Sequence, residues 1–166
     1  RDEEGSVGWA KATANAFNKL RLPACAEVAK PAWWNDEDLK ALSKRVVRAA
    51  PEDSTSQLMR AILLSGQCEA WEAGPRSAAK LKEAAEHFER SAELQAAPAL
   101  KAQRLSTAAA CRSVAEAMEA AEAEAKAKEM AVAEAKANAA MEALLAEEEA
   151  EKAAAASSGK GQGKGK

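Results

Sequence analysis

Few residues of this chain could carry out catalysis or bind a metal ion. His87 is the only histidine among 166 residues, so a Ser–His–Asp or Cys–His arrangement would have to use it, and no Gly-x-Ser-x-Gly motif accompanies it. Glu83 lies one helical turn before His87 and could add a second metal ligand, but a zinc site needs three or four ligands. The sequence therefore predicts no catalytic residue, no metal and no cofactor, and it predicts that His87 is exposed on a polar helix face.

The cysteines support the same conclusion. The chain has three, Cys25, Cys68 and Cys111, at intervals of 43 residues, which matches neither a disulfide framework nor a zinc site. Free cysteine commonly packs as a small apolar side chain. An odd number of cysteines without such spacing favours a reducing compartment, so we expect the cytoplasm, with the nucleus as the alternative.

The adjacent Trp33 and Trp34 are the most unusual apolar feature of the sequence. Two neighbouring side chains at a boundary between loop and helix cannot both face the same core, so we expect one of them to be exposed. An exposed tryptophan could anchor a protein partner, because tryptophan is enriched in binding hot spots. The alternative is a hydrophobic staple onto the helix that follows.

A group of cations provides a second candidate surface for partner binding. These cations are Lys40, Lys44, Arg45 and Arg48. They lie on the helix predicted after Asn35, on the face opposite its apolar positions. Such a basic stripe can bind an acidic peptide or a phosphate group. The acids at positions 36–38 lie beside the stripe and favour the alternative of a face that only contacts solvent.

The sequence argues against two other classes of partner. The longest run of bulky apolar residues, 62–64, is far shorter than the roughly 20 residues needed to cross a bilayer, so no membrane span is expected. The final segment 159–166 has three lysines and no aromatic residue for base stacking, which gives only weak, salt-sensitive contact with nucleic acid. We therefore expect a protein partner and no nucleic acid.

The apolar residues recur at helical spacing and never alternate over a strand length, which predicts an all-α fold. We expect a short helix over residues 9–22 and a helix capped by Asn35 that ends before Pro51. The third predicted helix begins at a capping box of Ser54 and Gln57, includes Trp71 and ends at residues 74–75. A fourth extends from about residue 81 to 97, and a fifth begins at Pro98 and continues without Gly or Pro until Gly159.

Composition divides these elements into four segments. The chain has 46 alanines but only 22 residues of Leu, Ile, Val and Phe, and those 22 are concentrated before residue 119. We predict a short helix and irregular segment over 1–34, a helical-hairpin domain over 35–118, an Ala/Glu/Lys-rich extended helix over 119–156 and a disordered Gly/Lys end over 157–166. On the fifth helix the residues expected in the core are Leu100, Leu105, Ala108, Cys111, Val114 and Met118.

One segment resembles a known helical repeat. Residues 82–94 resemble the second helix of a tetratricopeptide repeat, in which small residues alternate with an aromatic one, and the segments 48–51 and 95–98 repeat an Ala-Ala-Pro ending 47 residues apart. The first-helix pattern of that family is not found, and 47 exceeds its period of 34. The resemblance implies tetratricopeptide-like helical hairpins with a groove that binds a partner peptide.

The sequence therefore predicts a protein without enzymatic activity that acts as an interaction scaffold or adaptor. The alternative is that the Ala-rich helix is the functional part, as a structural spacer or a weakly self-associating, coiled-coil-like rod. Favourable i,i+4 pairs such as Glu122 with Lys126 and Glu124 with Lys128 support that helix, although sustained heptads are missing.

Overall fold

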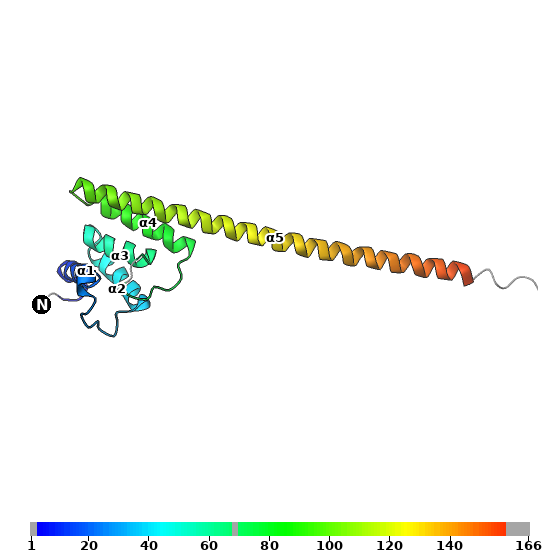
Figure 1. Cartoon of the computed structure of the whole chain (residues 1–166), viewed down its shortest axis with the longest axis horizontal. Coiled ribbons are helices and arrows are strands. Elements are labelled where there is room, and N and C mark those ends of the chain that lie inside the picture. The colour runs from blue at the N-terminus through cyan, green and yellow to red at the C-terminus, as the bar shows by residue number, and fades with distance from the viewer. Residues whose placement is uncertain (1–2, 68–69, 159–166) are drawn as a thin grey trace, which may run out of the picture. The chain divides into compact units, whose positions relative to one another are not determined.

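The computed structural model describes residues 3–67 and 70–158, and in these ranges the chain is helical without strands. The elements, drawn in Figure 1, are α1 (Val7–Leu20), the 3-10 turn η1 (Pro23–Cys25), α2 (Asp36–Ala49), α3 (Ser54–Ser65), α4 (Ala78–Glu93) and α5 (Pro98–Ser158). The predicted all-α class is confirmed. That the helices form tetratricopeptide-like hairpins stays a prediction.

The chain divides into two units, Arg1–Glu119 and Ala120–Lys166. The first unit contains α1 to α4 and the beginning of α5. Helix α1 contacts both α2 and α3 within this unit. The second unit consists of the remainder of α5 and the residues after it.

Helix α2 begins as predicted, because the Asn35 Oδ1 atom accepts a hydrogen bond of 3.0 Å from the backbone N–H of Asp38. The predicted start of α3 is wrong. Asp53, not Ser54, is the N-cap, and its carboxylate accepts from the backbone N–H of Ser56 at 2.8 Å. The Ser54 hydroxyl instead donates to the backbone carbonyl of Ser91 on α4, at 2.9 Å.

The predicted end of α3 is also wrong. The helix ends at Ser65 because Gly66 adopts a left-handed conformation with φ 68°, which glycine reaches without the steric cost that a side chain would add. The chain then leaves the helix direction. Trp71 therefore lies in the connection between α3 and α4 and packs into the core from there.

Helix α4 and the first part of α5 lie side by side in Figure 1 and are joined by ion pairs of Arg112 with Glu89 and of Lys82 with Glu119. The buried residues of α4 include the large Leu81 and Phe88. Those of α5 are all small, Ala108, Cys111 and Ala115, so only a narrow stripe of α5 is covered. The prediction that the larger apolar residues of this helix lie in the core is wrong. Their side chains are 39–50% exposed; they are Leu100, Leu105, Val114 and Met118.

Phe17, Trp34 and Trp71 form an aromatic cluster in the core. The ring centroids of Phe17 and Trp34 are 5.6 Å apart, those of Phe17 and Trp71 are 5.8 Å apart, and Trp34 meets Trp71 edge to face at 6.5 Å. The Trp34 Nε1–H donates to the backbone carbonyl of Ala70 at 3.0 Å. Trp34 thereby attaches the connection after α3 to the start of α2.

A buried ion pair fixes the same connection through Asp36. Its carboxylate accepts from Arg76 at 2.5 and 2.9 Å, from the Trp71 Nε1–H at 3.1 Å, and pairs with the Lys40 ammonium at 3.0 Å. Burial alone would raise the pKa of Asp36, but the hydrogen bonds from Arg76, Lys40 and Trp71 outweigh it and hold that pKa well below its ordinary value. Arg76 also donates to the backbone carbonyl of Leu63, at 2.8 Å.

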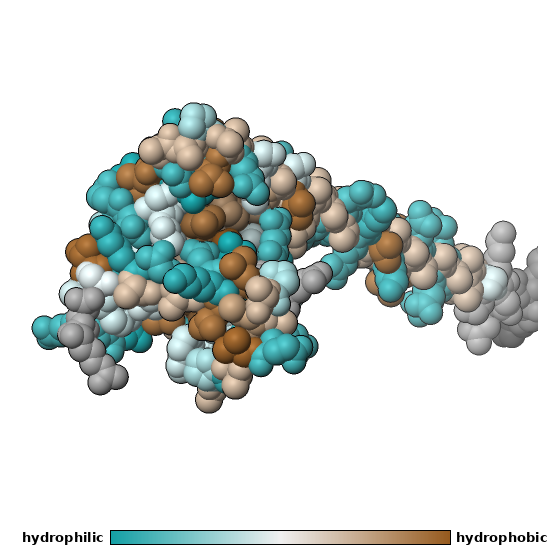
Figure 2. Space-filling view, turned by 60° about the vertical axis from the view of Figure 1, so that its left-hand side comes forward, coloured by the Kyte–Doolittle hydropathy of each residue, from teal (hydrophilic) through white to brown (hydrophobic). Residues whose placement is uncertain are grey.

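In the second unit the helix is exposed throughout its described length. Every residue from 120 to 157 is exposed, and in Figure 2 its strongly hydrophobic residues are isolated among pale and hydrophilic ones. The predicted pair of Glu124 and Lys128 forms, with 2.6 Å between Oε1 and Nζ. Helix α5 continues to Ser158, so the first two residues of the predicted disordered segment 157–166 are helical. Its remaining residues, 159–166, lie outside the described residues. Among the described helices, none combines the length and apolar character needed to cross a membrane.

A candidate partner-binding groove between α1 and α2

Two adjoining hollows form a groove between α1 and α2. The first has a volume of about 470 Å³, and its wall includes Trp9 and Thr13 of α1, Trp33 before α2, and Leu42 and Arg45 of α2. The second, of about 340 Å³, shares Trp9 and Arg45 and adds Arg48. We call these two hollows together the α1–α2 groove.

The two adjacent tryptophans have different environments, as the sequence predicts. Trp34 is 8% exposed, whereas Trp33 is 45% exposed and lines the groove. Trp34 immediately precedes the N-cap Asn35, and Leu39 lies at the fourth helical position, which are the two positions of a hydrophobic staple. Both are buried in the same cluster. Trp34 therefore occupies the staple position, whereas the exposed Trp33 ring lines the groove.

The structure separates the four residues of the predicted basic stripe. Arg45 and Arg48 line the groove, and Lys44 is exposed on the same helix. Lys40 does not belong with them, because its side chain is only 12% exposed and its ammonium pairs with Asp36 and Glu37 at 3.0 and 2.6 Å. These hydrogen bonds raise the pKa of Lys40, with the bond to Glu37 as the largest cause.

Trp9 is the groove residue that the sequence reasoning missed as a candidate. The guanidinium of Arg45 lies 5.5 Å from the centre of its ring and also pairs with the carboxylate of Glu4. The signal in the sequence was a large aromatic residue in the first turn of a helix, where the Ser6 side chain accepts from its backbone N–H at 3.1 Å. The Trp9 side chain is half-buried, and the accessible part of it lines the groove.

The groove offers an apolar surface and charged groups of both signs. Its described lining contains two indole rings, one threonine and four charged side chains, without histidine or cysteine. Indole rings offer large apolar surfaces at low cost in conformational entropy, which suits the recognition of a bulky side chain.

His87 lies elsewhere, between α4 and α3, and is not the exposed residue that the sequence predicts. Its side chain is 22% exposed, and its Nδ1 atom lies 2.6 Å from the Gln57 Oε1 atom. Burial and the charge of Arg60 lower the pKa of His87, while Glu83 and Glu86 act in the opposite direction. His87 is therefore a partly buried residue that joins α4 to α3 through its hydrogen bond with Gln57.

The free cysteines of the described residues are Cys25, half-buried, and Cys111, buried; Cys68 lies outside those residues. Burial raises the pKa of the Cys111 thiol, which favours the neutral thiol over the thiolate. In the described part of the chain, no three His, Cys, Asp or Glu side chains gather as metal ligands would.

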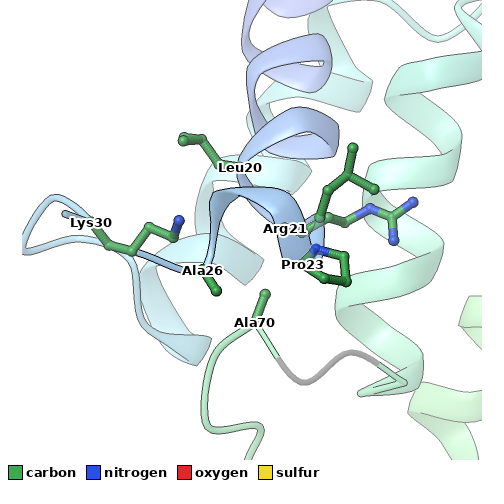
Figure 3. A pocket seen from close by; sticks show the side chains of 7 residues that line it. Leu20, Arg21, Pro23, Ala26, Lys30 and Ala70 are labelled. Atoms are coloured by element: carbon green, nitrogen blue, oxygen red, sulfur yellow. The ribbon is translucent and has the colours of Figure 1, made fainter. Parts of the chain in front are cut away.

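A third hollow, of about 470 Å³, lies between the end of α1, η1 and Ala70 (Figure 3). The Lys30 ammonium at its edge donates to the Cys25 carbonyl at 2.6 Å and lies 5.7 Å from the Trp34 ring. Figure 3 shows the Arg21 guanidinium pointing away from Lys30 and towards α3. Because the Lys30 ammonium is already bonded and the Arg21 guanidinium points elsewhere, the hollow offers few groups for the specific recognition of a ligand.

Comparison with known proteins yields no relative: no protein-family model, no curated protein and no solved structure matches this chain.

Proposed function

We propose that this chain is a protein-interaction module without enzymatic activity, which binds a segment of a partner protein in the α1–α2 groove. The observation that carries the proposal is the exposed Trp33 ring, which shares a cavity with Trp9. An indole that remains nearly half exposed beside a second aromatic ring is the kind of residue that forms a binding hot spot.

The charges around the groove define the partner segment. The groove lining has two acidic side chains, Glu4 and Asp38, and two basic ones, Arg45 and Arg48. Arg45 pairs with Glu4, whereas Arg48 and the nearby Lys44 have no carboxylate partner among the described residues. An acidic segment would supply the missing counter-charges. The proposed ligand is thus a peptide with one bulky apolar residue, seated between the two indoles, and acidic residues that face Arg45 and Arg48.

The arrangement of the helices supports a tetratricopeptide-like scaffold for this groove. Four-residue connections join α2 to α3 and α4 to α5, and α3 contacts both α2 and α4. Each of the two Ala-Ala-Pro segments lies at such a connection, with a helix on either side. A reducing compartment, the cytoplasm or the nucleus, belongs to the same proposal because Cys111 is a buried, unpaired thiol.

Selection from a random peptide library by the full chain tests the proposal. We expect the enriched peptides to combine a bulky apolar residue with acidic neighbours, and we expect Trp33→Ala to weaken their binding by at least about tenfold. Arg48→Glu should weaken the same peptides because it adds a repulsive charge. Affinities measured by isothermal titration calorimetry give the comparison.

Two substitutions outside the groove are the matched controls. Val28→Ala removes another apolar side chain, 47% exposed, and Lys136→Glu reverses an exposed charge in the second unit. Neither should change peptide affinity. Enrichment of basic peptides, or equal binding by Trp33→Ala and the parent chain, would overturn the proposal.

A second function rests on the second unit. All described residues from 116 to 157 are exposed, and these include Met141, Leu144 and Leu145 within two helical turns, at 56–64%. We infer a spacer whose helix self-associates weakly through these side chains. Sedimentation equilibrium should then show a concentration-dependent dimer that Leu144→Gln with Leu145→Gln abolishes, while Ala139→Gln with Ala140→Gln leaves it intact. A monomer at every concentration would leave only the spacer role.

A further inference from the structure

Two arginines line a cavity that is separate from the α1–α2 groove. The cavity, of about 340 Å³, lies between the end of α1, α3, α4 and the first turns of α5, and both Arg21 and Arg104 are among its walls. The Arg21 guanidinium points towards α3 in Figure 3, and Leu58, Ile62 and Ser65 of α3 are among the walls of this cavity. We call it the two-arginine pocket.

Neither arginine has a counter-ion among the described residues. Arg45, Arg60, Arg76, Arg90 and Arg112 each pair with a carboxylate, whereas Arg21 bonds only to the Asn18 side chain, through Nε at 3.0 Å. Arg104 is half-buried, and its hydrogen-bond partners are neutral oxygens. Burial lowers the pKa of Arg104, because its charge is partly removed from water without compensation.

The protein holds the Arg104 side chain in place. Its Nη1 donates to the Ser54 hydroxyl at 2.5 Å and to the Ser91 carbonyl at 2.9 Å. These are neutral acceptors, so they orient the guanidinium and leave its charge unpaired. Its Nε and Nη2 atoms donate to no described residue and are free for a ligand.

The remainder of the lining determines what kind of anion fits. Leu58, Ile62, Phe88 and Leu100 form the apolar wall of the pocket, and Leu100 is 45% exposed. The described lining contains no acidic side chain, so nothing there repels an anion. A volume of about 340 Å³ is at the small end of ligand sites, which suits a short chain better than a large headgroup.

We propose that the two-arginine pocket binds a carboxylate carried on a short aliphatic chain. The carboxylate pairs with the guanidiniums of Arg21 and Arg104, whose forked N–H groups match its geometry, and the chain packs against Leu58 and Leu100. Two sources share this chemistry: a free fatty acid, and the C-terminus of a peptide that ends in an apolar residue. The site is independent of the α1–α2 groove.

Titration of the full chain with two probes, followed by ¹H–¹⁵N NMR and calorimetry, tests the inference. Octanoate represents the fatty acid, N-acetyl-leucine represents the peptide end, and octanol and N-acetyl-leucinamide are their uncharged counterparts. We expect at least one carboxylate to bind and to change the amide chemical shifts of residues in the pocket. Its uncharged counterpart should bind at least about tenfold more weakly. Which carboxylate binds more tightly identifies the source.

Substitutions assign the binding to the pocket. Arg21→Gln should weaken the bound carboxylate by about tenfold or more, and Arg104→Gln should do the same. Because Arg104 also bonds to Ser54 and Ser91, Arg21→Gln is the variant that keeps the test valid if Arg104→Gln unfolds. Lys101→Gln removes an exposed cation on α5, outside the pocket, and should leave the affinity unchanged.

Three outcomes would overturn the inference. One is that neither carboxylate binds. Another is that Arg21→Gln binds as tightly as the parent chain. The third is that inorganic phosphate binds more tightly than both carboxylates. That result would show that the pocket binds anions by charge alone, without a contribution from the apolar wall.

Discussion

Replacement of Asp36 by Asn is expected to lower the free energy of unfolding by about 3 kcal/mol. The substitution keeps the size of the side chain but removes the negative charge that faces Arg76 and Lys40. Arg76 has a side chain only 7% exposed, so its charge would be left buried without compensation. Urea denaturation at pH 7, followed by circular dichroism, measures the loss.

The pH dependence of this loss tests its electrostatic origin. The pKa of Asp36 is lower in the folded chain than its ordinary value of 3.8, so its stabilisation is fully present above about pH 4 and is lost as the pH falls through the folded pKa. The difference between the parent chain and Asp36→Asn should therefore shrink between pH 5 and pH 2.

Glu37→Gln is the matched control, because Glu37 is the next residue and also pairs with Lys40. Its side chain is 85% exposed, and its loss should change the stability by no more than about 0.5 kcal/mol. An equal effect of the two substitutions, or a difference that stays constant with pH, would show that the buried ion pair is not what stabilises the connection after α3.

Trp34→Ala is expected to cost about 3–5 kcal/mol of stability. It empties the centre of the cluster with Phe17 and Trp71 and leaves the Ala70 carbonyl without its donor. Thermal or urea unfolding of the full chain measures the cost. Hydrogen exchange should also show faster opening of the connection after α3, since Trp34 holds one end of it.

Trp33→Ala is the control that separates the two tryptophans. Trp33 is 45% exposed and contacts the Trp34 ring only from outside, with 6.0 Å between centroids, so its loss should cost below about 1 kcal/mol. A reversed order, with Trp33→Ala the more destabilising, would contradict both the staple role of Trp34 and the availability of Trp33 to a partner.

Features that depend on local chemistry could be predicted from the sequence. The cap at Asn35 needs only an amide side chain and the N–H group three residues later, and the division of exposure between Trp33 and Trp34 follows from their adjacency. The continuity of α5 follows from the absence of Gly and Pro between residues 98 and 159.

The errors arose where distant residues compete with local rules. Ser54 has the right chemistry for a cap, but Ser91, 37 residues later, offers it a partner, and the adjacent Asp53 then serves as the cap. Lys40 was assigned to the basic stripe although an acid four residues earlier was a visible signal of pairing. That Asp36 is also held by Arg76, 40 residues away, could not be seen in any local pattern.

Three residues of the candidate groove can be predicted from the sequence as partner-binding candidates: Trp33, Arg45 and Arg48. The fold brings them to adjoining hollows. Trp9 cannot be predicted in this way, because nothing in a helical pattern shows that α1 lies beside α2. The two-arginine pocket was equally invisible, since its arginines are 83 positions apart.

The exposed part of α5 and its packed beginning are under different constraints on sequence change. From residue 116 to 157 no side chain is buried, so a substitution that preserves helix propensity and charge balance removes no packed contact there. A single-residue deletion turns the following residues by about 100° without separating any buried pair. Between Ala108 and Ala115 the same deletion would rotate one of these buried alanines out of the core. We therefore expect the exposed helix to vary in length and residue identity while keeping its composition, and the buried positions of α5 to tolerate only small residues.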